Sequence, residues 1–176
     1  MTDTAPIRLL LVGYGYWGVN LLRNFVAHPG FAVCGVVDAN PGQKQACHRL
    51  YPQVHFYQNL RQALTEQKPS AVAIATPPAT HKDVAITAIQ AGCHVLIETP
   101  MATSEPDCRA ILSSATQHKV QVMVDHTFVY HPAVEYLCRL LNNGDMGDLM
   151  YYDSIRVNLG GFQPHVNVVW DLAPHD

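Results

Sequence analysis

The sequence predicts an α/β fold in which a doubly wound parallel sheet is followed by the start of an incomplete α+β second domain. Three observations lead to this prediction. Short apolar runs alternate with helical segments along the first 125 residues, the runs are continuously apolar, and the first run ends in a glycine-rich turn. Alternation of this kind predicts parallel strands that are joined by right-handed crossovers.

The composition is that of an ordinary globular protein. Of the 176 residues, 48% are hydrophobic and 14% are charged. The net charge is -3 and the basic residues form no stripe along the sequence, so we expect no nucleic-acid partner. The five cysteines form no CxxC pair, which predicts reduced thiols in a cytoplasmic protein without a metal site. Apolar runs are too short to span a membrane and the first residues are not those of a signal peptide, so we expect no membrane association.

The first predicted strand covers residues 7–12, and the motif of residues 13–18, Gly-Tyr-Gly-Tyr-Trp-Gly, turns it into a helix through Phe25. Gly13 allows a tight turn, Gly15 lets the backbone approach a pyrophosphate, and Gly18 lets the helix pack close to the strand. The free N–H groups at the start of that helix would face the phosphates. Alone the motif is weak evidence, because glycine turns between strand and helix also have purely structural causes.

Asp38 strengthens the dinucleotide interpretation. It lies 20 residues after Gly18, at the end of the second predicted strand, residues 31–37. A carboxylate there accepts hydrogen bonds from both hydroxyls of an adenosine ribose and repels a 2'-phosphate. The sequence therefore predicts a Rossmann domain that binds NAD in preference to NADP.

The other elements of this domain follow in order, each ended by glycine, proline or a capping residue. We expect strands at residues 54–57, 71–75, 93–97 and 120–124 and helices at residues 43–50, 59–67, 84–91 and 104–119. Asn59 and Ser104 are the predicted N-caps of two of these helices, and Gly92 is the predicted stop of a third.

The pattern changes after Asp125, so we divide the chain into a dinucleotide-binding domain, residues 1–125, and part of a second domain, residues 126–176. A helix begins at His131 or Pro132 with Val134, Leu137, Cys138 and Leu141 predicted to face inward. One long strand is predicted at residues 149–159, and residues 160–169 are predicted to form a loop.

These motifs resemble those of the Gfo/Idh/MocA family of NAD(P)-dependent sugar oxidoreductases, and the resemblance covers the whole chain. It is carried by residues 13–18, by Thr-Pro-Pro-Ala-Thr-His at 76–81, by residues 91–100 and by Trp-Asp-Leu-Ala-Pro-His-Asp at 170–176. Residues 156–176 are most similar to the branch that oxidises the 3-hydroxyl of UDP-linked amino sugars and their uronic acids. The resemblance implies a second domain with a large, mostly antiparallel sheet, so we expect this chain to be truncated.

The resemblance also implies the site residues. His175 would be the base that takes the hydroxyl proton, and Asp171 would orient its imidazole or bind the sugar hydroxyl if the intervening stretch is helical. From spacing alone this pair is as typical of helix caps and surface positions. His81 lies where the loop on the nicotinamide side enters a helix, although a capping role would explain it equally well. The implied cofactor-binding residues are Gly13, Tyr14, Gly15, Tyr16, Trp17, Gly18, Asp38, Thr76, Pro77, His81 and Glu98.

Thr99 departs from the family pattern. The family's Glu-Lys-Pro triplet places a lysine beside the nicotinamide, and here the triplet is Glu98-Thr99-Pro100. A threonine hydroxyl donates one hydrogen bond but carries no charge, so the substitution is expected to reduce the rate by a factor on the order of 10² to 10³. Pro100 keeps the option of a cis peptide bond.

Two functions remain open at the level of sequence. The first is an NAD-dependent sugar dehydrogenase, which acts on a sugar or nucleotide-sugar substrate and forms a homo-oligomer. The second is a non-catalytic dinucleotide-binding protein that has lost the lysine and most of the second domain. Asp171 and His175 favour the first function, whereas Thr99 favours the second.

Overall fold

The computed structural model describes residues 5–155 and 167–175. The chain falls into two compact units, Met1–Val124 and Asp125–Asp176. This division lies one residue before the predicted domain boundary, which was placed after residue 125. In the described parts of the chain every helix is too short or too polar to pass through a lipid bilayer.

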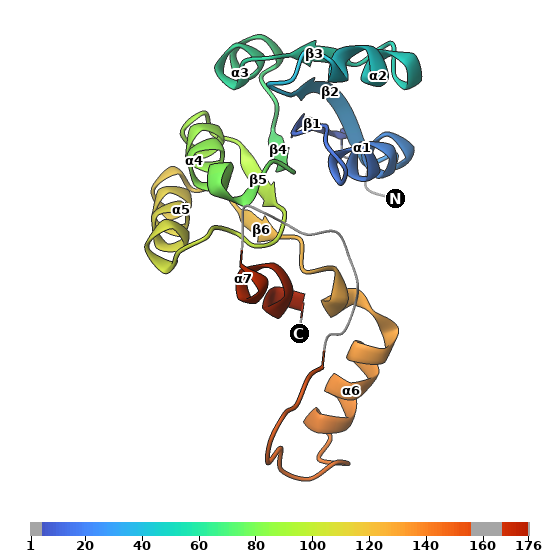
Figure 1. Ribbon diagram of the computed structural model, residues 1–176, viewed down its shortest axis with the longest axis vertical. Helices are drawn as coiled ribbons and strands as arrows, with labels where there is room; N and C mark the ends of the chain where they lie inside the picture. The colour runs from blue at the N-terminus through green and yellow to red at the C-terminus, as the bar shows by residue number, and fades with distance from the viewer. Residues whose placement is uncertain (1–4, 156–166, 176) are drawn as a thin grey trace. The chain divides into compact units, whose positions relative to one another are not determined.

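Among the described residues, the first unit contains a six-stranded sheet in which all paired strands are parallel (Figure 1). Its strand order is β3-β2-β1-β4-β5-β6. The chain moves outward from β1 through β2 and β3 and then returns to the other side of β1, so the order reverses between β1 and β4. The predicted doubly wound sheet is therefore confirmed. The strands are β1 (Ile7–Val12), β2 (Phe31–Val37), β3 (His55–Tyr57), β4 (Ala71–Ile74), β5 (His94–Ile97) and β6 (Val122–Val124).

Helices cover both faces of the sheet, as the alternation of side chains along β1 shows. Leu9 and Leu11 pack in one buried cluster with residues of α1 and α2, whereas Leu10 and Val12 pack in a second cluster with residues of α3, α4 and α5. Both faces of β1 are thus apolar, which explains the continuous apolar run. The helices are α1 (Gly18–Ala27), α2 (Gln43–Leu50), α3 (Leu60–Gln67), α4 (His81–Gln90) and α5 (Glu105–His118), with a short 3-10 helix η1 (Pro78–Thr80) before α4.

The predicted N-caps of α3 and α5 are confirmed. The Asn59 side chain accepts a hydrogen bond from the backbone N–H of Gln62 at 3.0 Å, and the Ser104 hydroxyl accepts one from the backbone N–H of Asp107 at 3.3 Å. Each cap satisfies a backbone donor that has no partner within its helix.

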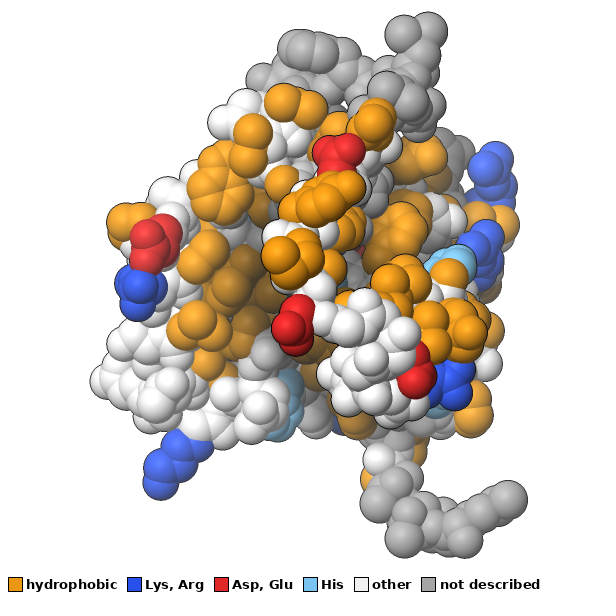
Figure 2. Space-filling model, turned by 90° about the horizontal axis from the view of Figure 1, so that it is seen from below, with side chains coloured by type: hydrophobic (Ala, Val, Ile, Leu, Met, Phe, Trp, Pro, Cys, Tyr) orange, Lys and Arg blue, Asp and Glu red, His pale blue; other side chains and the backbone are white. Residues whose placement is uncertain are grey.

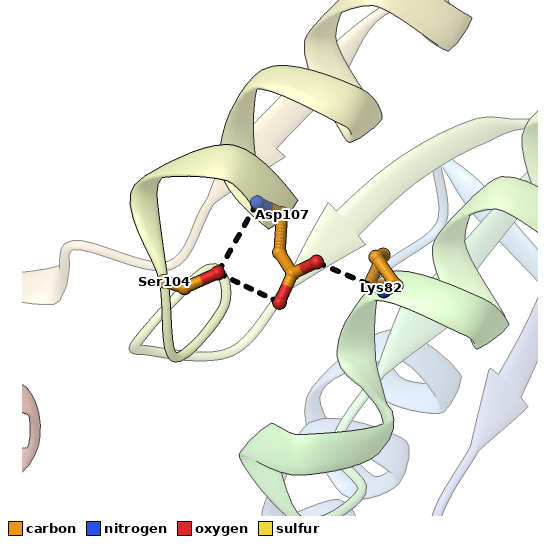
Figure 3. Close-up of polar contacts among 3 residues, drawn as sticks. All are labelled: Lys82, Ser104 and Asp107. Atoms are coloured by element: carbon orange, nitrogen blue, oxygen red, sulfur yellow. Dashed lines mark hydrogen bonds and ion pairs between the residues drawn. The ribbon is translucent and has the colours of Figure 1, made fainter.

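An ion pair joins α4 to α5 (Figure 3). The Lys82 Nζ lies 2.8 Å from the Asp107 Oδ1, and the Ser104 hydroxyl donates to the Asp107 Oδ2 at 2.8 Å. Asp107 therefore accepts hydrogen bonds from its own helix cap and from the neighbouring helix. The same ion pair raises the pKa of Lys82.

We expect Asp107→Asn to destabilise the first unit at neutral pH and to have a smaller effect in acid. The hydrogen bond from Lys82, followed by that from Ser104, holds the pKa of Asp107 below its usual value. The stabilisation is therefore present above the unfolded-state pKa and is lost as the pH falls below about 4. Urea unfolding of wild type and variant between about pH 7 and about pH 3 measures this difference.

Glu105→Gln is the matched control for this prediction. It also removes a carboxylate from the first turn of α5, but its ion pair with Arg109 is exposed and lies within one helix. A pH-dependent loss of the same size in both variants would show that the contact with Lys82 contributes nothing specific.

The second unit is mainly helical among the residues described. It contains α6 (Pro132–Asn142), α7 (Val168–Leu172) and the 3-10 helices η2 (Thr127–Tyr130) and η3 (Ala173–His175). His131 opens α6, as predicted, and its Nδ1 accepts a hydrogen bond from the backbone N–H of Ala133 at 3.2 Å.

The prediction that the apolar side chains of α6 face inward is wrong. Leu137, Cys138 and Leu141 are exposed, and no described residue of α6 is buried. The amphipathic spacing is present, but spacing alone does not show whether a side chain becomes buried. Figure 2 shows hydrophobic side chains over much of the face that it draws. The exposed large hydrophobic residues of the second unit are Phe128, Val129, Tyr130, Tyr136, Leu137, Leu141, Met146, Leu149, Met150, Tyr151, Tyr152, Ile155, Val168 and Val169.

The predicted strand at residues 149–159 is also wrong in its described part, because residues 149–155 form neither strand nor helix. Residues 156–159, like most of the loop predicted at 160–169, lie outside the described residues; Val168 and Val169 begin α7 instead of continuing that loop. The residue types of 149–155 suit a strand, but a strand exists only where a partner supplies backbone hydrogen bonds.

Candidate functional site

The sheet gathers most of the predicted site residues along one edge. Gly13 follows β1, Asp38 follows β2, Thr76 comes shortly after β4, and Glu98 and Thr99 follow β5. Because the carboxyl ends of parallel strands meet at the same edge, these five residues lie around the point where the strand order reverses. Asp171 and His175 belong to the second unit.

Gly13 and Gly18 are required by close backbone approaches. Gly13 has a φ of +97°, and a Cβ on it would lie 2.5 Å from the carbonyl oxygen of Ala75. A Cβ on Gly18 would lie 2.0 Å from the carbonyl oxygen of Gly13. Glycine at both positions therefore lets the turn, α1 and the loop after β4 lie against one another.

Gly15 differs from the other two glycines because open space surrounds it. A Cβ at this position would meet no atom within 4 Å. No packing within the described chain requires a glycine here, but a ligand that approaches the backbone does. The neighbouring α1 has no acidic side chain in its first turn, so the positive end of the helix dipole is not neutralised from within.

The aromatic residues of the turn have different environments. Tyr14 is buried, which raises the pKa of its phenol, and it packs in the cluster beneath α1 and α2. Tyr16 is 91% exposed and Trp17 is also exposed. Tyr14 therefore anchors the turn to the core, whereas Tyr16 and Trp17 are accessible to a ligand.

Asp38 has a structural role that the sequence analysis missed. Its Oδ2 accepts a hydrogen bond from the backbone N–H of Tyr14 at 2.7 Å, and its Oδ1 accepts one from the backbone N–H of Asn40 at 2.8 Å. The contact with Asn40 is an Asx turn, which the sequence Asp-Ala-Asn-Pro-Gly could have indicated. A carboxylate has about four acceptor positions, so capacity remains for two hydroxyl donors.

The loop after β4 is held by its own hydroxyl groups. Thr80 donates to the side-chain oxygen of Thr76 and is within hydrogen-bond distance of the carbonyl oxygen of Pro77, both at 2.8 Å. Thr76 is half-buried and Pro77 is exposed. The backbone nitrogen of Thr76 also lies beside Gly13, since a Cβ on that glycine would come within 2.9 Å of it. The loop thus borders the glycine turn directly.

The loop after β5 contains the Glu-Thr-Pro triplet. The Thr99–Pro100 peptide bond is cis, the option that the proline was predicted to allow. Glu98 and Thr99 are half-buried, Pro100 is buried, and the Glu98 Oε2 accepts from the backbone N–H of Thr99 at 3.3 Å.

His81 connects these two loops. Its side chain is 0% exposed, with Nε2 2.7 Å from the carbonyl oxygen of Thr76 and Nδ1 2.9 Å from that of Pro100. Burial lowers the pKa of this imidazole, and the contacts with backbone carbonyls oppose that effect only in part. Both ring nitrogens are therefore engaged with the backbone.

The remaining two candidates lie in a short helical segment. Asp171 belongs to α7, and His175 ends η3, where its ring lies edge-on to Phe128 with centroids 5.6 Å apart. The backbone changes from α-helix to 3-10 helix at Ala173, so the segment is helical but not one continuous α-helix. The i, i+4 geometry assumed for this pair therefore does not apply unchanged.

The first unit fits a dinucleotide. The reversal of strand order, the turn with open space at Gly15, and the acid after β2 together define a dinucleotide-binding Rossmann domain. Residues 7–126 match the description "Oxidoreductase family, NAD-binding Rossmann fold". The chain belongs to this Gfo/Idh/MocA family, and its first unit is the NAD-binding domain.

Named relatives cover several activities. A 2,7-anhydro-N-acetylneuraminate hydratase of Mediterraneibacter gnavus is 31% identical over 157 residues, which are 89% of this chain and 41% of the relative. A UDP-N-acetylglucosamine 3-dehydrogenase of Acidithiobacillus ferrooxidans is 34% identical over 109 residues, 60% of this chain and 33% of that protein. The chain thus spans less than half the length of these relatives.

A solved structure extends the similarity to three dimensions. The WlbA dehydrogenase of Bordetella pertussis, crystallised with NADH and UDP-GlcNAcA, superimposes with a TM-score of 0.75 and 26% identity over 80% of this chain and 44% of WlbA. This similarity agrees with the fold and family established above.

Proposed function

We propose that this chain carries the cofactor domain of an NAD-dependent oxidoreductase that oxidises a sugar hydroxyl by taking a hydride from the carbon that bears it. Our proposed substrate is a UDP-linked amino sugar or its uronic acid, oxidised at C3. The main supporting observation is the juxtaposition of open space at Gly15 with the Asp38 carboxylate beside the same turn. The relative named UDP-N-acetylglucosamine 3-dehydrogenase and the neighbour crystallised with UDP-GlcNAcA support the choice of sugar.

NAD, when bound, would supply the hydride acceptor, and the residues of this chain would bind it and handle the proton. The backbone around Gly15 and the start of α1 would bind the pyrophosphate, and Asp38 would accept from the adenosine ribose. We propose that His175 takes the hydroxyl proton, since a neutral imidazole is a suitable base near neutral pH, and that Asp171 orients it or binds the sugar.

We expect the chain to bind NAD(H) at least about tenfold more tightly than NADP(H), because hydrogen bonds to a charged group contribute roughly 1.5–3 kcal/mol each. In Asp38→Asn this preference should shrink, since the charge that repels a 2'-phosphate is removed while one side-chain oxygen remains. Calorimetric titration with both cofactors measures the ratio of their dissociation constants.

Two controls accompany this experiment. Glu66→Gln removes one negative charge from an exposed position on α3 and should leave the ratio unchanged. Thermal unfolding of Asp38→Asn separates damage to the turn, which Asp38 holds through Tyr14, from a loss of ribose recognition. If the unaltered chain bound NADP(H) as tightly as NAD(H), Asp38 would not have the role proposed for it.

The alternative function is a dinucleotide-binding protein without catalysis, which the uncharged Thr99 favours. NADH formation from NAD and UDP-N-acetylglucosamine, followed by absorbance, separates the two functions. Cofactor binding without turnover in the full-length protein would support the alternative. Assembly into a homo-oligomer and a cytoplasmic location stay predictions.

A further inference from the structure

The strand order determines which loops lie near each half of a bound dinucleotide. Asp38 marks the adenosine side because it follows β2, and the glycine turn after β1 marks the pyrophosphate. The sheet continues on the other side of β1 with β4 and then β5. The nicotinamide half therefore extends over the carboxyl ends of these two strands, where Thr76 and the Glu-Thr-Pro triplet lie.

His81 lies under these two loops and bridges them. It is the one polar residue among the described residues that is fully buried, and its nitrogens approach the carbonyl oxygens of Thr76 and Pro100, which are 24 positions apart in the sequence. Few strand-pairing contacts hold these loops, because the ladder between β4 and β5 ends at Ile74 and Ile97. One side chain thus continues the connection beyond the end of the sheet.

The contacts of His81 leave it no nitrogen for a ligand. A neutral imidazole has one N–H donor, and here both ring nitrogens face carbonyl oxygens, so one carbonyl accepts a hydrogen bond and the other faces the second nitrogen. A protonated ring would donate to both. In either state the polar atoms of the ring contact backbone groups, and burial shields the ring from the space above the loops.

We propose that His81 is a positioning residue for the nicotinamide half of NAD, which acts by holding the backbone at Thr76 and Pro100 in register with each other. The position of Thr99 follows from this, because it directly precedes the residue whose carbonyl the ring contacts. Loss of the bridge lets the two loops move apart without disturbing the adenosine side, which is built from β1, β2 and α1. The proposal rests on the proposed use of NAD.

Substitution with asparagine and glutamine tests each contact separately. An asparagine amide nitrogen reaches about as far as Nδ1 and so can donate to Pro100, whereas a glutamine amide nitrogen reaches about as far as Nε2 and can donate to Thr76. His81→Ala removes both contacts. Calorimetric titrations of each variant with NAD and with ADP, which lacks the nicotinamide half, report the two halves of the site.

We expect His81→Ala to weaken NAD binding by roughly tenfold or more while ADP binding changes by less than about twofold. The variant that keeps the donating contact, either His81→Gln or His81→Asn, should regain most of the NAD affinity. His94→Ala is the matched control, because His94 lies at the opposite end of β5, where its Nδ1 accepts from the backbone N–H of Gln121. It should alter neither affinity.

A merely structural role predicts other results. Equal losses for NAD and ADP, an unchanged NAD affinity in His81→Ala, or a failure of both amide variants to regain affinity would each overturn the proposal. If His81→Ala does not fold, the comparison of His81→Asn with His81→Gln decides. Different NAD affinities of these two variants, at equal ADP affinity, would support the proposal, and equal NAD affinities would overturn it. Absence of NAD binding in the unaltered chain would overturn the proposed function itself, which is a distinct result.

Discussion

Replacing Gly18 with alanine is expected to destabilise the first unit by about 3 kcal/mol or more, which corresponds to a fall in melting temperature of roughly 10 °C. The new Cβ would lie 2.0 Å from the carbonyl oxygen of Gly13. That oxygen belongs to the backbone of a turn enclosed by β1, α1 and the loop after β4, so it cannot rotate away as a flexible side chain would. The whole turn has to move.

Gly15→Ala is the matched substitution in the same motif, and its expected effect is the opposite. A Cβ there meets nothing within 4 Å, so the melting temperature should stay close to that of the unaltered chain. The methyl group would occupy the space through which a pyrophosphate approaches the backbone, and we expect NAD affinity to fall at least about tenfold.

Thermal unfolding and calorimetric titration of both variants check this pair of predictions. A loss of stability at Gly18, where the turn itself is displaced, and a loss of ligand binding without a stability effect at Gly15 would separate the packing role of one glycine from the binding role of the other. A Gly15→Ala variant that bound NAD normally would show that the pyrophosphate lies elsewhere.

Replacing Thr99 with lysine is expected to raise turnover by roughly one to three decades, the range for a single preorganised electrostatic donor. A threonine hydroxyl can donate a hydrogen bond but carries no charge, whereas an ammonium group would stabilise the alkoxide that develops when the proposed base, His175, takes the proton. The substitution leaves Pro100 and its contact with His81 in place.

The unaltered protein and its Thr99→Lys variant are compared in the same assay, with NAD and UDP-amino sugars as substrates. NADH formation from UDP-amino sugars would be measured from about pH 6 to about pH 10, the range in which a base of the histidine type and a lysine titrate. Thr99→Met is the control, since it lengthens the side chain without adding a charge. High activity with threonine and no gain with lysine would mean that this protein stabilises the alkoxide in another way.

Sequence reasoning was most successful where a local physical rule, such as a helix cap or a tight turn, determines which residue type stands at a position. The glycine turn, the two capping residues and the continuous apolar strands each follow from a local rule, and the parallel, doubly wound sheet follows from the alternation of strands and helices. The second unit was harder to predict. Leu137 and Leu141 have helical spacing, but spacing does not show whether a packing partner exists, and both are exposed among the described residues.

Residues 149–155 show the same limit for strands. Tyrosine and isoleucine in this segment favour extended backbone, yet a strand forms only when another segment accepts and donates its backbone hydrogen bonds. No described residue of the chain does so. The strand prediction therefore failed because it depended on pairing that a local pattern does not determine.

The sequence by itself determined the dinucleotide-binding domain, because the spacing of the glycines and the position of the acid at residue 38 can both be read directly along the chain. Only the tertiary structure decided the two roles of Asp38 and the place of His81. Asp38 holds Tyr14 as well as offering acceptors to a ribose, and His81 bridges carbonyls 24 residues apart. Contacts between residues that are distant in sequence depend on how the strands are ordered in the sheet, and they leave no periodic signal in the chain.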